Sequence, residues 1–154
     1  IEGRTADLIR ELSDALGNVR VGNPGSKDVD MGALASQGQR EEVRERIAEL
    51  TNEADIVHGG DAEMALIDAD PAKGAFFLPT LLHCQKPLAA KAVHSVEAFG
   101  PVSTVLPYDS LDEAVALHNG VPQGLSSSIF TKNLLEAGSR PGPDARPPLS
   151  CSAT

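Results

Sequence analysis

Aromatic side chains are scarce in this sequence, and tryptophan is absent. Phe, Tyr and Trp together make up 3% of the 154 residues. The core must therefore be built from Ala, Val, Leu and Ile, which remove less surface from water per residue than aromatic side chains do. The length still corresponds to one domain that can enclose a core.

Positive charge is also in short supply, with 13 Lys and Arg residues against 22 Asp and Glu and a net charge of −9. Phosphates repel such a chain, so we expect neither nucleic acid nor a membrane as its partner. No apolar run approaches the ~20 residues that span a bilayer, and we find no secretory leader. Two cysteines form no disulfide framework. These absences predict a soluble, cytoplasmic protein.

One short stretch combines groups that are typical of a ligand site. Glu97 and Phe99 stand two residues apart and are followed directly by Gly100 and Pro101. Glycine permits close backbone approach or a positive φ, and proline fixes φ and lacks an N–H. The two side chains are therefore predicted to lie on a stiff bend before a strand over 102–106. The alternative is a strand-entry turn with one solvated glutamate and one core phenylalanine.

This stretch belongs to an ordered series of motifs along the chain. The series includes Val21-Gly22-Asn23-Pro24, Met31-Gly32-Ala33-Leu34, Gly59-Gly60, Phe77-Leu78-Pro79-Thr80-Leu81, Tyr108-Asp109, Gly124-Leu125 and Ile129-Phe130-Thr131. From about Asp7 to Thr131 the sequence resembles the aldehyde dehydrogenase superfamily. The resemblance implies an α/β fold, a partial catalytic domain with a mainly parallel sheet flanked by helices. The variants at 31–36 and 40–43 resemble the branch that acts on CoA-linked semialdehydes in phenylacetate and benzoate breakdown.

The resemblance also implies roles for three residues in binding NAD or NADP. The family's glutamate in the Glu-x-Phe-Gly-Pro motif bonds the nicotinamide ribose, and its phenylalanine lies against the cofactor. Glu97 and Phe99 occupy these positions, and Gln39 occupies that of a glutamine that reaches the ribose in several members. Gln39 has a second interpretation, because Ser36 and Gln39 have the spacing of a capping box. One departure is Glu42, where some members have lysine.

The groups that carry out the family's chemistry are expected upstream of Val21. The chain is therefore interpreted as a C-terminal portion of the catalytic domain that contains no catalytic residue. The family are oxidoreductases that act on aldehydes, and this chain alone is predicted to be inactive. The alternative is a non-catalytic remnant or interaction module that forms a homo-oligomer or pairs with the missing upstream half. His83, Cys84 and His94 do not complete a metal site, and Cys84 is expected to be a buried small apolar group.

Hydrophobic periodicity predicts helices over 5–20 and from 37 to 50, the second capped by Ser36. Strands are expected at 56–57, over 74–82 at an edge or bulge because of Pro79, over 102–106, and over 125–131. Ser110 caps a further helix, and the strand–helix–strand order predicts a parallel crossover. The expected domains are a partial catalytic domain, 1–137, and a tail, 138–154, in which four of eleven prolines disfavour regular structure.

Overall fold

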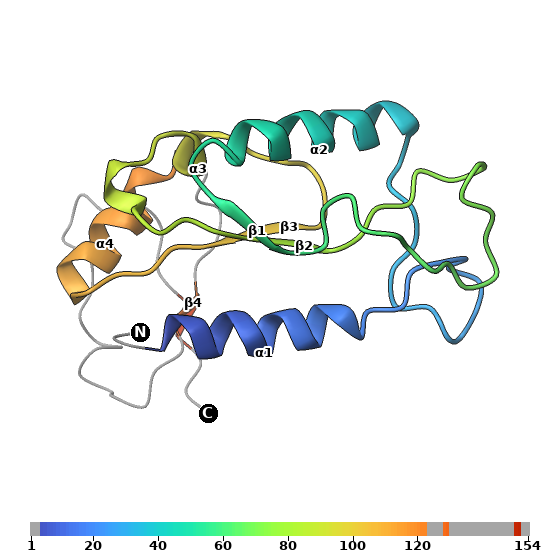
Figure 1. Ribbon diagram of the computed structural model, residues 1–154, viewed down its shortest axis with the longest axis horizontal. Coiled ribbons are helices and arrows are strands. Elements are labelled where there is room, and N and C mark those ends of the chain that lie inside the picture. Colours follow the sequence, from blue (N-terminus) through green and yellow to red (C-terminus); the bar gives the residue numbers. More distant parts are fainter. Residues whose placement is uncertain (1–3, 123–127, 130–149, 152–154) are drawn as a thin grey trace. The chain divides into compact units, whose positions relative to one another are not determined.

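The computed structural model describes residues 4–122, 128–129 and 150–151 of the chain (Figure 1). The chain divides into two compact units, Ile1–Pro107 and Tyr108–Thr154. The first unit contains helices α1, α2 and α3 with a three-stranded sheet, and the second contains α4 with a two-stranded sheet.

The two long helices of the first unit form where the apolar spacing predicts them. Helix α1 spans Thr5–Gly17, and its C-terminal turn closes where Asn18 N–H donates to the Ala15 carbonyl at 3.2 Å. Helix α2 spans Gln37–Leu50 and is capped by Ser36, as predicted. Its buried residues are Val43, Ile47 and Leu50, which lie on one face because residues three and four apart are neighbours on a helix.

The sheet of the first unit has the order β1-β2-β3, with β1 at Asp55–His58, β2 at Thr80–His83 and β3 at Val102–Val105. Strand β2 pairs antiparallel with β1 and parallel with β3, with Thr80 opposite Val102. The prediction of an edge or bulged strand over 74–82 is wrong. Pro79 lies just before the strand, and the first amide that needs a partner is that of Thr80, which donates to the Pro101 carbonyl at 2.8 Å. Strand β2 is therefore central.

Helices α1 and α2 lie on opposite sides of this sheet (Figure 1), so the first unit has three layers. On the α2 side, Leu82 is 0% exposed and packs with Leu50, Ala54 and Cys84. The short helix α3, Ala92–Ser95, follows a single 3₁₀ turn at Pro87–Ala89, and Val93 packs against the same cluster. A second buried cluster joins Val43 and Ile47 of α2 to Phe77, and Val102 contacts both clusters. The core therefore connects α2 with the start of β3.

In the second unit, α4 spans Leu111–Gly120, and β4 at Ser128–Ile129 pairs in parallel with β5 at Ser150–Cys151. Ser110 Oγ accepts from the Glu113 amide at 3.2 Å, as its predicted capping box requires. The predicted crossover through α4 is not met among the described strands, because β4 belongs to a separate two-stranded sheet. Apart from β4 and β5, the strand expected over 125–131 and the tail expected over 138–154 lie outside the described residues.

The α/β fold class is confirmed. Helices flank the three-stranded sheet, and two of the three strand pairs formed by the described residues are parallel. Within the part of the chain that the structure describes, no helix has the length and apolar character to cross a lipid bilayer.

Candidate functional site

The segment from α3 to β3 is a chain of tight turns. The Val96 amide donates to the Ala92 carbonyl at 2.8 Å as α3 ends. Beyond it, Gly100 N–H donates to the Ala98 carbonyl and Val102 N–H to the Gly100 carbonyl, both at 2.8 Å. Each of these bonds spans two residues, the pattern of a γ-turn. The backbone between Ala98 and Val102 is therefore closely constrained, as the Gly-Pro sequence predicts.

Gly100 is required here for close approach. A Cβ built on Gly100 would lie 2.7 Å from Cγ2 of Val43, a distance that real Cβ atoms essentially never show. Val43 is 0% exposed, so it has little room to move. The described glycines with positive φ are instead Gly59 and Gly60, in the turn after β1. Close backbone approach, and not a positive φ, is therefore the reason for a glycine at position 100.

Gln39 connects the start of α2 to this segment. Its Oε1 accepts from the Ala35 amide at 3.0 Å, and its Nε2 donates to the Phe99 carbonyl at 2.6 Å. The backbone N–H of Gln39 in turn donates to Ser36 Oγ at 3.1 Å. The capping interpretation is therefore confirmed for the helix start, although the Gln39 side chain reaches the residue before the cap. The same side chain also bonds a residue 60 positions away.

The side chains of Glu97 and Phe99 are both directed to solvent. Phe99 is 61% exposed, so the alternative in which it belongs to the core is wrong. Glu97 is exposed and makes no hydrogen bond or ion pair with any described residue. The structure thus brings Gln39 to the backbone of Phe99, while the Glu97 carboxylate and the Phe99 ring both stand on the surface of a constrained turn. This arrangement leaves an anionic acceptor and an apolar ring available to a ligand.

The central strand stabilises the other side of the turn. Thr80 is 1% exposed, and its amide bonds the Pro101 carbonyl. Its Oγ1 accepts from Gly60 N–H at 3.0 Å and donates to the Leu78 carbonyl at 3.0 Å. The buried hydroxyl therefore has both a donor and an acceptor partner, as a buried polar group requires. Gly59, with φ at 76°, has no room for a Cβ beside the Pro79 carbonyl.

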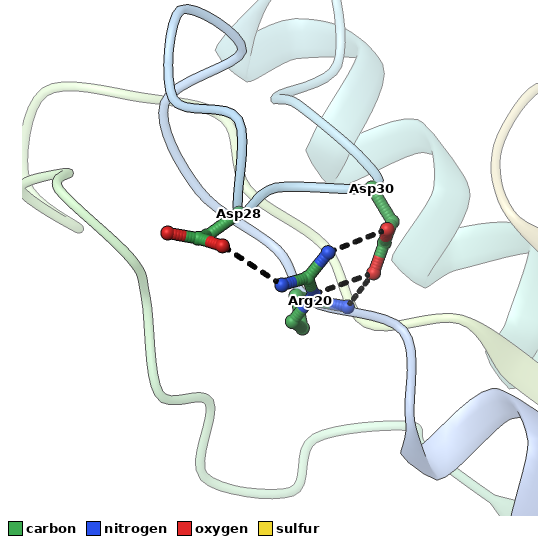
Figure 2. Close-up of polar contacts among 3 residues, drawn as sticks. All are labelled: Arg20, Asp28 and Asp30. Atoms are coloured by element: carbon green, nitrogen blue, oxygen red, sulfur yellow. Dashed lines mark hydrogen bonds and ion pairs between the residues drawn. The ribbon is translucent and has the colours of Figure 1, made fainter.

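A cluster of charged residues closes the loop that contains the Val21-Gly22-Asn23-Pro24 motif (Figure 2). Arg20 Nε bonds Asp30 Oδ2 at 3.1 Å, Nη2 bonds Oδ1 at 3.2 Å, and Nη1 bonds Asp28 at 3.3 Å. The Arg20 amide also donates to Asp30 Oδ2 at 2.9 Å. The Arg20 side chain lowers the pKa of Asp30, and Asp30 in turn raises the pKa of Arg20. Sequence reasoning missed this cluster, because a spacing of ten residues in a loop follows no helix or strand period.

Cys84 and His94 both take part in the packing and hydrogen bonding of the first unit. Cys84 is 1% exposed and packs in the core, which confirms its expected role. His94 Nε2 lies 2.8 Å from the Pro87 carbonyl oxygen. Among the described residues, no three His, Cys, Asp or Glu side chains lie close enough to hold a metal ion.

Comparison with known proteins agrees with this fold. Residues 2–139 match the profile of the aldehyde dehydrogenase family. The chain therefore belongs to the aldehyde dehydrogenase family. It is 42% identical over 130 residues to the 3,4-dehydroadipyl-CoA semialdehyde dehydrogenase of Aromatoleum evansii, a match that covers 82% of this chain and 25% of the relative.

Solved structures of the family have the same fold. The betaine aldehyde dehydrogenase of Staphylococcus aureus in complex with NAD⁺ superposes with a TM-score of 0.77 at 27% identity, over 89% of this chain and 26% of that protein. The succinic semialdehyde dehydrogenase of Streptococcus pyogenes in complex with NADP⁺ gives 0.74 at 25% identity, over 89% of this chain and 28% of that protein. The chain thus spans about a quarter of the length of the relatives it matches.

Proposed function

We propose that this chain forms the ribose-binding side of the NAD(P) site in an aldehyde dehydrogenase. The observation that supports this proposal best is that the Glu97 carboxylate and the Phe99 ring are both exposed on one turn. Gln39 donates a hydrogen bond to the Phe99 carbonyl in that turn. These residues occupy the family's Glu-x-Phe-Gly-Pro positions. Two of the similar structures contain NAD⁺ or NADP⁺.

In this proposal Glu97 accepts hydrogen bonds from the nicotinamide ribose, which keeps the nicotinamide within reach of the reacting carbon. The Phe99 ring lies against the cofactor. Gln39 has one N–H left after its bond to Phe99 and can donate it to the ribose. The cofactor, when bound, accepts the hydride that leaves the aldehyde, and the residues of this chain only bind and orient it.

We further propose that the complete enzyme oxidises a CoA-linked semialdehyde to the acid, in the cytoplasm, as a step in the breakdown of aromatic compounds. The support is the 42% identity to a dehydrogenase whose name states a CoA semialdehyde substrate. The chain covers a quarter of that relative, so both activity and substrate belong to the proposal.

The 154-residue chain alone is proposed to lack activity. Cys84 is buried in the core, where an aldehyde has no access. We expect no aldehyde-dependent formation of NADH or NADPH, measured at 340 nm with the purified chain. Turnover that Cys84→Ala abolishes would contradict the proposal.

Titration of the ¹⁵N-labelled chain with NAD and NADP tests the binding role directly. We expect a Kd of about 1 mM, because one side of a site contributes on the order of −4 kcal/mol. Amide shifts should concentrate at 96–102 and disappear with Glu97→Gln. Glu45→Gln is the matched control, since Glu45 is an exposed residue of α2 whose side chain bonds no other described residue. Micromolar affinity, or shifts confined to other segments, would show that the site is misplaced.

A second candidate is a non-catalytic interaction module. The observation that favours it is a pair of apolar side chains on the surface of the first unit, of which Ile56 of β1 is 42% exposed. Leu88 is also 60% exposed. A surface of this kind is suited to pairing with a second copy or with the remainder of the family fold. Light scattering after size exclusion tests it, and a well-folded monomer at every concentration would count against it.

A further inference from the structure

Glu53 is placed to determine where helix α3 begins. It lies in the turn between α2 and β1, and its carboxylate accepts from three successive backbone amides. Lys91 N–H lies 3.0 and 2.9 Å from its two oxygens, Ala92 N–H lies 2.7 Å away, and Val93 N–H lies 3.3 Å away. The N-terminal amides of a helix have no partner within the helix. Here they are bonded by a residue 38 to 40 positions earlier in the sequence.

Helix α3 depends on this contact because it is very short. It contains four residues, and the residue at its N-cap position, Lys91, makes no side-chain capping bond. One helical turn is unstable in isolation, because it fixes several dihedral angles for a single hydrogen bond. Glu53 supplies the missing acceptor, and Val93 of α3 packs on the core cluster that also contains Leu50 and Ala54.

The proposed ribose ligand follows α3 almost at once. Val96 is the C-cap residue of the helix, and Glu97 is the next residue. On the far side of Glu97, the Phe99 carbonyl is bonded by Gln39 from the start of α2. The segment that contains Glu97 is therefore bonded from both sides by polar side chains, one at the beginning of α2 and one just beyond its end.

We propose that Glu53 is a positioning residue, which places the Glu97 carboxylate for the cofactor by capping α3. The relevance to the cofactor rests on the proposed function, whereas the effect of Glu53 on the position of residues 96–100 does not. Glu53 itself touches no cofactor in this arrangement.

The charge state of Glu53 agrees with this geometry. Its pKa is lowered first by the Lys91 amide, then by the Val93 and Ala92 amides, and also by nearby His94. A depressed pKa keeps the Glu53 carboxylate charged, and the charged form is the one that accepts from three amide donors.

A pH titration of the ¹⁵N-labelled wild-type chain tests the contact without any substitution. We expect the chemical shifts of the Lys91, Ala92 and Val93 amide protons to change together at a pH below the usual glutamate range. Amides that stay unchanged through that range would overturn the proposal.

Hydrogen exchange in Glu53→Gln then tests the positioning effect, with Glu45→Gln as the matched control of equal charge change. We expect exchange at Val96 and Gly100 to become roughly tenfold faster in Glu53→Gln, since a lost cap opens the adjoining turn locally. Leu12 of α1 should be unaffected. Unchanged exchange at Val96 and Gly100 overturns the proposal. So does an equal increase at Leu12, because it would mark a general loss of stability.

Nucleotide titration of the same variants separates this proposal from the proposed function. If both hold, Glu53→Gln weakens NAD binding several-fold and Glu45→Gln does not. If the wild-type chain shows no nucleotide binding, the proposed function fails, and the exchange rates at Val96 and Gly100 still decide the role of Glu53. If nucleotide binding is present and equal in Glu53→Gln and wild type, the positioning proposal fails alone.

Discussion

The turn at Glu97–Pro101 and the loop at Arg20–Met31 are both fixed by side-chain contacts, but the contacts differ in kind. The turn rests on the steric contact of Gly100 with Val43, which is 0% exposed. The loop is closed by Arg20 and Asp30, whose side chains are each 46% exposed. Packing is insensitive to salt and pH, whereas exposed ion pairs are screened and titrate. The proposed cofactor-binding segment is therefore expected to be the more robust of the two.

The largest effect is expected from Gly100→Ala. The new methyl group would meet Val43 Cγ2 at 2.7 Å, and overpacking of this kind lowers the free energy of unfolding by about 1–3 kcal/mol. Urea denaturation measures the loss. Gly38→Ala is the matched control, because its methyl group would have Ser36 Oγ as its neighbour at 3.8 Å. In the double variant with Val43→Ala we expect a loss smaller than the sum of the two single losses, because the smaller side chain relieves the clash. Equal denaturation midpoints for Gly100→Ala and wild type would contradict the steric account.

A smaller effect is expected from Gln39→Glu. The substitution keeps an acceptor for the Ala35 amide but replaces the donor to the Phe99 carbonyl by an oxygen. We expect a loss of about 1 kcal/mol in the free energy of unfolding, the usual contribution of one hydrogen bond. Gln37→Glu makes the same chemical change at an exposed position on the first turn of α2 and should be neutral. Equal stability of the two variants would show that the Gln39–Phe99 bond contributes nothing.

The smallest effect is expected at the Arg20 loop, and it should depend on pH. The folded-state pKa of Asp30 lies below its ordinary value of 3.8. Its contribution to stability is therefore complete above that value and is lost as the pH falls through the folded-state pKa. We expect amide exchange at Gly22 and Met31, corrected for the intrinsic pH dependence, to accelerate in acid and in high salt.

In Asp30→Asn, amide exchange at Gly22 and Met31 should no longer change with salt or between neutral and acidic pH. Asp28→Asn is the control, because Asp28 makes one 3.3 Å contact and its side chain is 78% exposed. If both variants behave alike, the bidentate Arg20–Asp30 geometry has no special role in closing the loop.

Features determined by neighbouring residues were predicted well from the sequence. Helix α2 is capped by Ser36 and buries Val43, Ile47 and Leu50, because a capping residue and a helical apolar spacing are both local signals. The family motif identified the constrained turn at Glu97 and Phe99 in the same way. Its interpretation as a ribose-binding site stays a prediction.

Features determined by distant residues were not predicted. Pro79 within the apolar segment 74–82 favoured an edge or bulged strand, yet β2 is central because the proline falls one residue outside the ladder. The bond from Gln39 to Phe99 and the cap of α3 by Glu53 join residues 60 and about 40 positions apart. No local spacing encodes such pairs, since the folding of the intervening chain brings them together.

The irregularity in β1 has a consequence for self-association. Ile56 pairs with Leu82 and His58 with Leu81, so Val57 is an extra residue in the strand. A bulge in an outer strand distorts the row of amides that a foreign strand would use as a template, and proteins use this device against aggregation. In the described three-stranded sheet, β3 retains a regular four-residue register with its neighbour. Any strand added to this sheet should therefore join beside β3.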